Sequence, residues 1–229
     1  MGTRRQIVSG VAGALALVIL AGASYTGYRN YKDAQFKTQA CAVIKGQQAD
    51  RGPIIDIPGD GERVAIIGDS YSSGDTLSNY RDAWPFAFAA ETGTSVTLSG
   101  IGWTGFVDPG VCDTDAFGTR LAVTDNADVV IVQGGLNDTD TASEVQAAAV
   151  ELLQMIDAPR IVVVGPVDAP AVNGEKAVDI ALHNAADTAG AEYVSALDWP
   201  ITFGSDQTHL DPQGYESFAD HVAGAMAAN

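Results

Sequence analysis

Residues 63–70 read RVAIIGDS, an apolar run that ends in Gly68-Asp69-Ser70. The run is rich in β-branched residues and lies between an arginine and a glycine, which is typical of a buried β-strand. In an open α/β sheet, ligands bind outside the carboxyl ends of the strands, where the connecting loops converge. We therefore expect Ser70 to lie at the functional edge of a sheet.

Similar apolar runs recur along the chain and alternate with stretches that favour helices. The expected strands cover Val64–Ile67, Val96–Leu98, Val129–Val132, Ile161–Val164 and Tyr193–Leu197. The expected helices cover Trp84–Glu91, Ala142–Ile156, Glu175–Ala189 and Pro212–Ala228. Asp211 precedes the last helix as a favoured N-cap. The alternation predicts an α/β fold in which helices cover both faces of a parallel sheet.

The first residues of the chain resemble a membrane-targeting segment. Arg4 and Arg5 precede an uncharged, mostly apolar run from Ile7 to Ser24. As a helix this run spans about 27 Å, near the lower limit for crossing a bilayer, whereas the small residues at 21–23 are typical of a cleavage site. We expect residues 1–24 to be a signal peptide or an N-terminal transmembrane anchor. The remainder is expected to be exported, either secreted or held in the cell envelope.

The 229 residues are enough for one catalytic domain after this segment. Residues 25–62 have mixed charge, little periodicity and a closing cluster of proline and glycine, which predicts a juxtamembrane linker. The domain is expected over residues 63–229.

The chain is strongly acidic, with 12 basic and 29 acidic residues and a net charge of −17. Such a surface repels nucleic acid and favours a soluble monomer. Contact with a membrane is expected only through the N-terminal segment, if that segment is not cleaved.

The chain has two cysteines, Cys41 and Cys112. In an oxidising exported compartment they are candidates for one disulfide, and the alternative is two unpaired thiols. Neither lies near a histidine or another cysteine at metal-binding spacing. No metal and no cofactor are expected.

Four short segments follow the expected strands and carry residues suited to acyl transfer. They are Gly68-Asp69-Ser70, Gly102, Gly135-Leu136-Asn137-Asp138 and Asp206-Gln207-Thr208-His209. Because the carboxyl ends of parallel strands meet at one edge of a sheet, we expect these segments to converge there.

A serine hydroxyl is a weak nucleophile and needs a base that takes its proton during attack. His183 and His221 fall inside expected helices, where a structural role is usual. His209 lies in a loop at the correct edge of the sheet, and the nearby Asp206 can orient its imidazole. We predict a catalytic triad of Ser70, His209 and Asp206. The alternative is a turn capped by Asp206 next to a solvated histidine.

The tetrahedral intermediate of acyl transfer carries negative charge on the former carbonyl oxygen, which needs preorganised donors. We expect an oxyanion hole formed by Ser70 N–H, Gly102 N–H and the Asn137 side-chain amide. A glycine at position 102 lets the backbone approach the reacting carbon closely. The alternatives are a turn role for Gly102 and an Asx turn at Asn137.

The four segments resemble the four blocks of the SGNH, or GDSL-type, hydrolases, and the resemblance extends from about residue 63 to residue 228. Residues 101–106, 164–167 and 209–215 are similar to exported actinobacterial-type members. The resemblance implies a flavodoxin-like three-layer α/β/α sandwich with a five-stranded parallel sheet of order 2-1-3-4-5. It also implies a structural role for Asp69 and an acyl-enzyme on Ser70. Trp103 and Tyr71 depart from the family pattern.

These features predict an exported serine esterase that cleaves a small-molecule, lipid or glycan acyl ester. One alternative is an O-acyltransferase that uses the same residues on a cell-envelope glycan or lipid. Another is a non-catalytic binding module of the same fold. The loops that set specificity contain three aromatic residues, Trp103, Phe106 and Phe117, which either line an acyl pocket or anchor the loops.

Overall fold

The computed structural model describes residues 29–228. The chain divides after Val43 into two compact units, and residues 29–51 are helical. The expected signal peptide or anchor, residues 1–24, lies outside the described residues. Within the described range, no helix is both long enough and apolar enough to cross a membrane.

The second unit is built on one six-stranded sheet with the order β1-β3-β2-β4-β5-β6. The strands are β1 (Ile55–Ile57), β2 (Arg63–Gly68), β3 (Ser95–Gly100), β4 (Val129–Gln133), β5 (Arg160–Val167) and β6 (Glu192–Ala196). Strands β2 to β6 are parallel, and their spatial order matches the predicted 2-1-3-4-5. The prediction of five strands needs one correction, because β1 adds a sixth strand, antiparallel to β3.

The stretch expected to be a linker, residues 25–62, carries regular secondary structure over most of its described length. Residues 29–51 form a helix, and β1 pairs Ile55 with Leu98 and Ile57 with Val96. A strand of three residues is too short for an alternating pattern to stand out in a sequence. The compact unit that holds the sheet begins at Ile44.

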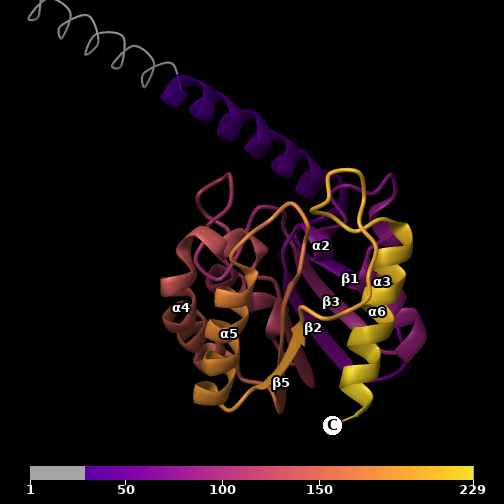
Figure 1. Cartoon of the computed structure of the whole chain (residues 1–229). Helices are drawn as coiled ribbons and strands as arrows, with labels where there is room; N and C mark the ends of the chain where they lie inside the picture. The colour runs from indigo at the N-terminus through magenta and orange to yellow at the C-terminus, as the bar shows by residue number, and fades with distance from the viewer. Residues whose placement is uncertain (1–28, 229) are drawn as a thin grey trace, which may run out of the picture. The chain divides into compact units, whose positions relative to one another are not determined.

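Helices cover both faces of the sheet, which confirms the predicted class. The main helices are α3 (Trp84–Thr92), α4 (Ala142–Met155), α5 (Glu175–Ala189) and α6 (Pro212–Ala227). Helices α4 and α5 pack together on one face, and α3 and α6 pack together on the other (Figure 1). Asp211 is the N-cap of α6, as expected, and its carboxylate accepts from Gly214 N–H at 2.8 Å.

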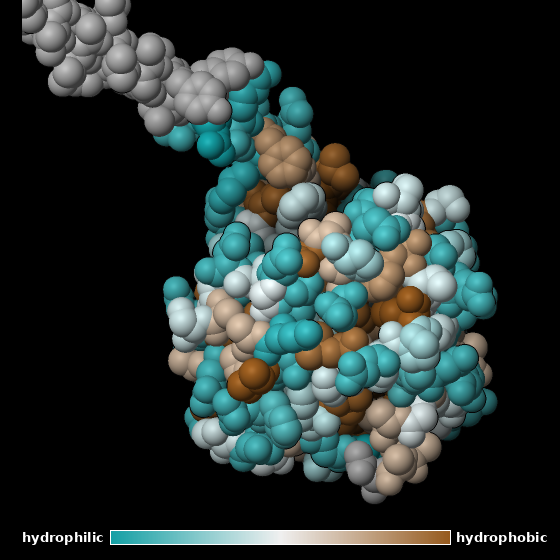
Figure 2. Space-filling view, viewed as in Figure 1, coloured by the Kyte–Doolittle hydropathy of each residue, from teal (hydrophilic) through white to brown (hydrophobic). Residues whose placement is uncertain are grey.

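The alternating side chains of β2 divide the core into two layers. Val64 and Ile66 pack in the cluster under α3 and α6, whereas Ala65 and Ile67 pack in the cluster under α4 and α5. All four side chains are buried, so this strand is apolar on both faces, as a central parallel strand should be. On the face drawn in Figure 2, hydrophilic and hydrophobic residues are interspersed over the domain.

The register of the central strands sets the position of the site. Gly68, the last residue of β2, pairs with Gly100 of β3 and Gln133 of β4. Three strands therefore end at the same level, and the three loops that follow them start side by side.

Candidate active site

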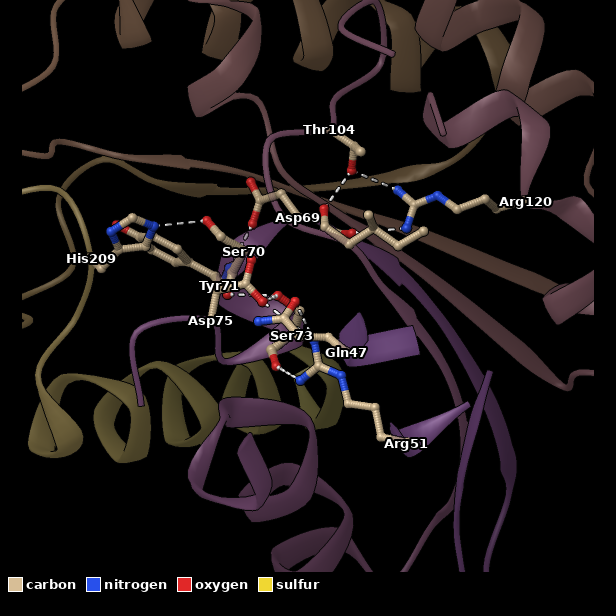
Figure 3. A network of polar contacts seen from close by, with 12 residues as sticks. Gln47, Arg51, Asp69, Ser70, Tyr71, Ser73, Asp75, Thr104, Arg120 and His209 are labelled. Atoms are coloured by element: carbon tan, nitrogen blue, oxygen red, sulfur yellow. Dashed lines mark hydrogen bonds and ion pairs between the residues drawn. The ribbon is translucent and has the colours of Figure 1, made fainter. Parts of the chain in front are cut away.

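The serine predicted as nucleophile lies in a sharp turn directly after β2. Ser70 opens α2 (Ser70–Ser73), a helix of one turn that ends at Gly74, whose φ is 69°. Asp69 caps the turn, because its carboxylate accepts from Tyr71 N–H at 2.9 Å. This turn places the Ser70 side chain at the carboxyl edge of the sheet (Figure 3).

The structure brings Ser70, His209 and Asp206 together. His209 Nε2 lies 3.1 Å from Ser70 Oγ, and His209 Nδ1 lies 2.7 Å from Asp206 Oδ2. Figure 3 shows the imidazole turned toward the serine hydroxyl. The second carboxylate oxygen of Asp206 accepts from the backbone N–H groups of Thr208 and His209, at 3.1 Å and 2.9 Å. The loop is therefore folded around the aspartate, which fixes the orientation of the histidine ring.

The surroundings of Asp206 favour its ionised form. Partial burial raises the pKa of Asp206, but the hydrogen bonds from the His209 ring and from the backbone N–H groups of His209 and Thr208 outweigh it. The net pKa is lowered below the ordinary value of an aspartate. The carboxylate is thus negative at neutral pH, and it can stabilise an imidazolium on His209.

Gly102 lies in the loop after β3, beside the nucleophile. A Cβ atom at this position would be 1.9 Å from Asp75 Oδ2 and 3.6 Å from Ser70 Cβ. The absent side chain at position 102 therefore makes room for the Asp75 carboxylate, a reason for glycine that the sequence did not indicate.

Asn137, the third expected donor, lies in the short 3₁₀ helix η4 (Leu136–Thr141), which follows β4. Its Nδ2 donates to the Thr104 carbonyl at 2.9 Å. A carboxamide nitrogen carries two N–H groups, so this bond orients the amide and leaves a second N–H for another acceptor. The bond also ties the β4 loop to the loop that contains Gly102.

Asp138 also holds the loop after β3, through the backbone of residues 106–108. Its buried carboxylate accepts three backbone hydrogen bonds, from Phe106 at 2.8 Å, Val107 at 3.0 Å and Asp108 at 2.9 Å. Burial raises the pKa of Asp138, and the three N–H donors only partly oppose it. Asn137 and Asp138 therefore both hold the loop after β3 that contains Gly102, which we call the oxyanion loop because Gly102 is an expected oxyanion donor.

Arg120 is a partly buried cation that the sequence did not reveal as part of the site. Its guanidinium donates to the carbonyls of Gly68 at 3.1 Å and Ser99 at 2.8 Å, and to Thr104 Oγ1 at 3.1 Å. It also lies over the Phe117 ring, 4.8 Å from the ring centre. Arg120 thus joins the ends of β2 and β3 to the oxyanion loop (Figure 3).

Asp69 lies in a buried polar network beneath the nucleophile. Gln133 Nε2 lies 3.3 Å from Asp69 Oδ1, Ser72 Oγ donates to Gln133 Oε1 at 2.7 Å, and Trp84 Nε1 donates to Ser72 Oγ at 3.1 Å. Burial raises the pKa of Asp69 to about 6, against the effect of its hydrogen bonds from Tyr71 and Gln133. These contacts are those of a structural residue that holds the turn.

Most of the sequence also matches a known family. A model of the GDSL-like lipase/acylhydrolase family covers residues 66–217, about two thirds of the chain. The chain belongs to this family. No curated protein has significant sequence similarity to this GDSL-like hydrolase.

Several solved structures share the fold of this GDSL-like hydrolase. Est24, a carbohydrate acetylesterase from Sinorhizobium meliloti, has a TM-score of 0.63 and 21% identity, over 73% of this chain and 99% of that chain. An aryl esterase from M. smegmatis has a TM-score of 0.59 and 18% identity, with the same coverage of 73% and 99%. A putative arylesterase from Agrobacterium tumefaciens has a TM-score of 0.60 and 17% identity, again covering 73% and 99%. These likenesses establish the fold.

The aromatic residues near the site of this GDSL-like hydrolase have different environments. Phe106 and Phe117 are buried against each other, with ring centres 4.9 Å apart, and so anchor their loops. Trp103 is 49% exposed and has a φ of 67°, unusual for a residue with a side chain. His183 stacks on Tyr193 and His221 stacks on Trp199.

The cysteines and the potential metal ligands were the remaining residues of interest in the sequence. Cys41 and Cys112 are both disulfide-bonded, and neither is a free thiol. Among residues 29–228, no group of three histidine, cysteine or acidic side chains has the arrangement of a metal site.

Proposed function

We propose that this hydrolase is a serine esterase that cleaves small carboxylic esters through an acyl-enzyme on Ser70. One observation carries the proposal: the His209 ring lies between the Ser70 hydroxyl, 3.1 Å from Nε2, and the Asp206 carboxylate, 2.7 Å from Nδ1. A nucleophile, a base and a group that orients the base are the parts that acyl transfer at a serine requires. This geometry favours an enzyme over a non-catalytic module of the same fold.

In the first half of the reaction, Ser70 Oγ attacks the carbonyl carbon of the ester while His209 Nε2 takes the hydroxyl proton. Asp206 stabilises the resulting imidazolium through its bond to Nδ1. The negative charge on the former carbonyl oxygen faces Ser70 N–H, Gly102 N–H and Asn137 Nδ2. When the tetrahedral intermediate collapses, the bond to the alcohol oxygen breaks and the alcohol leaves with the proton from His209.

In the second half, water replaces the alcohol. The water oxygen attacks the acyl carbon while His209 takes a proton from the water. His209 then gives that proton to Ser70 Oγ as the ester bond to the enzyme breaks. The products are a carboxylic acid and an alcohol. The free serine and a neutral histidine are restored at the end of the cycle.

For the substrate, we propose short acyl groups, with acetyl esters of carbohydrates and aryl acetates as the first compounds to test. The support is the chemistry named for similar structures, a carbohydrate acetylesterase and an aryl esterase. Trp103, half exposed in the loop that contains Gly102, presents an aromatic surface at this end of the sheet.

We also propose that the enzyme acts outside the cytoplasm, as a monomer. The apolar run from Ile7 to Ser24 after Arg4 and Arg5 supports export, and so does the disulfide bonding of Cys41 and Cys112, because disulfides persist in oxidising compartments. The acidic composition supports a monomer. Cell fractionation with antibody detection tests the location, and a protein found only in the cytosol contradicts it.

The test of the function is hydrolysis of p-nitrophenyl acetate and of an acetylated xylose by the full chain and three variants. In Ser70→Ala and in His209→Gln, kcat is expected to fall at least about a thousandfold. Ser195→Ala is the matched control, because it removes a serine hydroxyl whose partner is Asp179, outside the site. Parental turnover by Ser70→Ala would refute the proposal.

A further inference from the structure

Arg51 reaches the nucleophile turn from a part of the chain that the family model does not cover. It is the last residue of the helical segment 29–51, whereas the family match begins at residue 66. Its Nη1 donates to the Ser73 carbonyl at 2.8 Å, and its Nη2 lies 3.4 Å from Asp75 Oδ1 (Figure 3). The guanidinium also lies over the Tyr80 ring, 5.1 Å from its centre, and the side chain is only 11% exposed.

The two oxygens of Asp75 have different surroundings. Oδ1 accepts from Ser73 Oγ at 2.6 Å and pairs with Arg51 at 3.4 Å. Oδ2 faces Gly102, because it lies 1.9 Å from the point where a Cβ of that residue would stand. The same point is 3.6 Å from Ser70 Cβ, so the Asp75 carboxylate and the Ser70 side chain both lie on the side of Gly102 where a side chain would stand.

This placement creates an electrostatic problem for acyl transfer. The Asp75 side chain is 15% exposed, so water screens its charge poorly. A carboxylate beside Gly102 opposes the negative charge that develops on the substrate oxygen in the transition state. A cation that pairs with the carboxylate removes most of this opposition, and Arg51 is in place to do so.

We propose that Arg51 is a positioning residue of the active site. It holds Asp75 against the oxyanion loop and cancels the charge that would otherwise oppose the oxyanion. The proposal rests on the proposed esterase function, and it makes the end of the N-terminal helical segment part of the catalytic unit. Arg51 also closes the nucleophile turn, since Ser73 is the last residue of α2 and its carbonyl has no partner within the helix.

The proposal predicts that the effect of losing Arg51 depends on the charge of Asp75. In Arg51→Gln, kcat for p-nitrophenyl acetate is expected to fall about tenfold or more, with KM changed less than about twofold, because the charge acts on the transition state. Arg51→Lys keeps the positive charge and is expected to retain activity within about threefold. In the double variant Arg51→Gln with Asp75→Asn, kcat is expected to return to within about threefold of the parent.

Arg81→Gln is the matched control. Arg81 also lies over the Tyr80 ring, 5.6 Å from its centre, but it is exposed. Its loss is expected to leave both kcat and KM unchanged. Thermal melting of every variant shows whether the fold is retained.

Two results overturn the proposal: parental kcat in Arg51→Gln, or an equal loss of kcat in Arg51→Gln and in the double variant. If Arg51→Gln does not fold, the double variant is compared with Asp75→Asn alone. The kcat of the double variant must then lie within about threefold of that of Asp75→Asn, and a larger fall in kcat contradicts the proposal. Wild-type and Ser70→Ala proteins in the same assay separate this outcome from failure of the esterase function, which an inactive wild type would indicate.

Discussion

The hydroxyl of Tyr71 donates to the Thr208 carbonyl at 2.5 Å. The residue that follows the nucleophile is thereby bonded to the residue that precedes the base. Tyr71 is almost fully buried and packs edge-on against Tyr215 and Phe218 of α6. The distance between Ser70 and His209 thus depends on a phenol that is itself held by the core.

Tyr71→Phe removes only this hydroxyl. We expect kcat to fall about five- to tenfold, because the His209 loop loses a direct bond to the turn, and stability to fall by about 1 kcal/mol. Steady-state kinetics and urea denaturation measure the two effects. Tyr193→Phe is the control, since it removes a hydroxyl bonded to Asp179 outside the site and should leave kcat unchanged. An equal fall in kcat for both variants would show that the Tyr71 bond has no special role.

Arg120→Met tests the partly buried cation that joins the ends of β2 and β3 to the loop that contains Gly102 and Thr104. The change leaves the carbonyls of Gly68 and Ser99 without this donor, so we expect a loss of about 3 kcal/mol in stability and a lower kcat. Urea denaturation and kinetics provide the measurements. Arg63→Met is the control, because the Arg63 pair with Asp128 is exposed to solvent and contributes little to stability. Equal stability of the two variants would contradict the anchoring role of Arg120.

Asp69→Asn tests the pKa of the buried carboxyl beside the nucleophile. The pKa of Asp69 is about 6 in the fold and about 3.9 in the unfolded chain, so between these values only the folded state keeps the proton. The free energy of unfolding therefore decreases as pH rises through this window, and the asparagine variant lacks this decrease.

The free energy of unfolding of Asp69→Asn, measured relative to that of the parent, should therefore rise by about 1 kcal/mol from about pH 5 to about pH 7. Urea denaturation at the two pH values measures the difference, and other acidic groups cancel in the comparison. Parallel pH dependence in the two proteins would mean that the Asp69 pKa is not raised.

Periodicity was enough to predict the central sheet and its helices. Strands such as Val64–Ile67 are buried on both faces, so their apolar runs are unbroken, and α5 begins and ends at the predicted residues, Glu175 and Ala189. Strand β1 could not be predicted in this way, because three residues with one aspartate among them carry no distinct pattern.

The residues that support the site were hidden for a different reason. Tyr71 and Thr208 are 137 positions apart, and Arg51 and Asp75 are 24 positions apart, so neither pair forms a local motif. The convergence of Ser70, His209 and Asp206 could be predicted because acyl transfer needs particular side chains at strand ends. An arginine that anchors carbonyls, such as Arg120, can occupy many positions, and only the tertiary fold shows which loops it joins.

The most direct measurement is the site of covalent labelling by a fluorophosphonate, identified by peptide mass spectrometry on the full chain. The proposed mechanism predicts one phosphonyl group on Ser70, and no labelling of Ser70→Ala or after heat denaturation. The mapping must separate Ser70 from Ser72 and Ser73 in the same turn, whose hydroxyls are bonded to Gln133 and Asp75. An unlabelled wild-type protein, or a group found on a serine other than Ser70, would contradict the proposed mechanism.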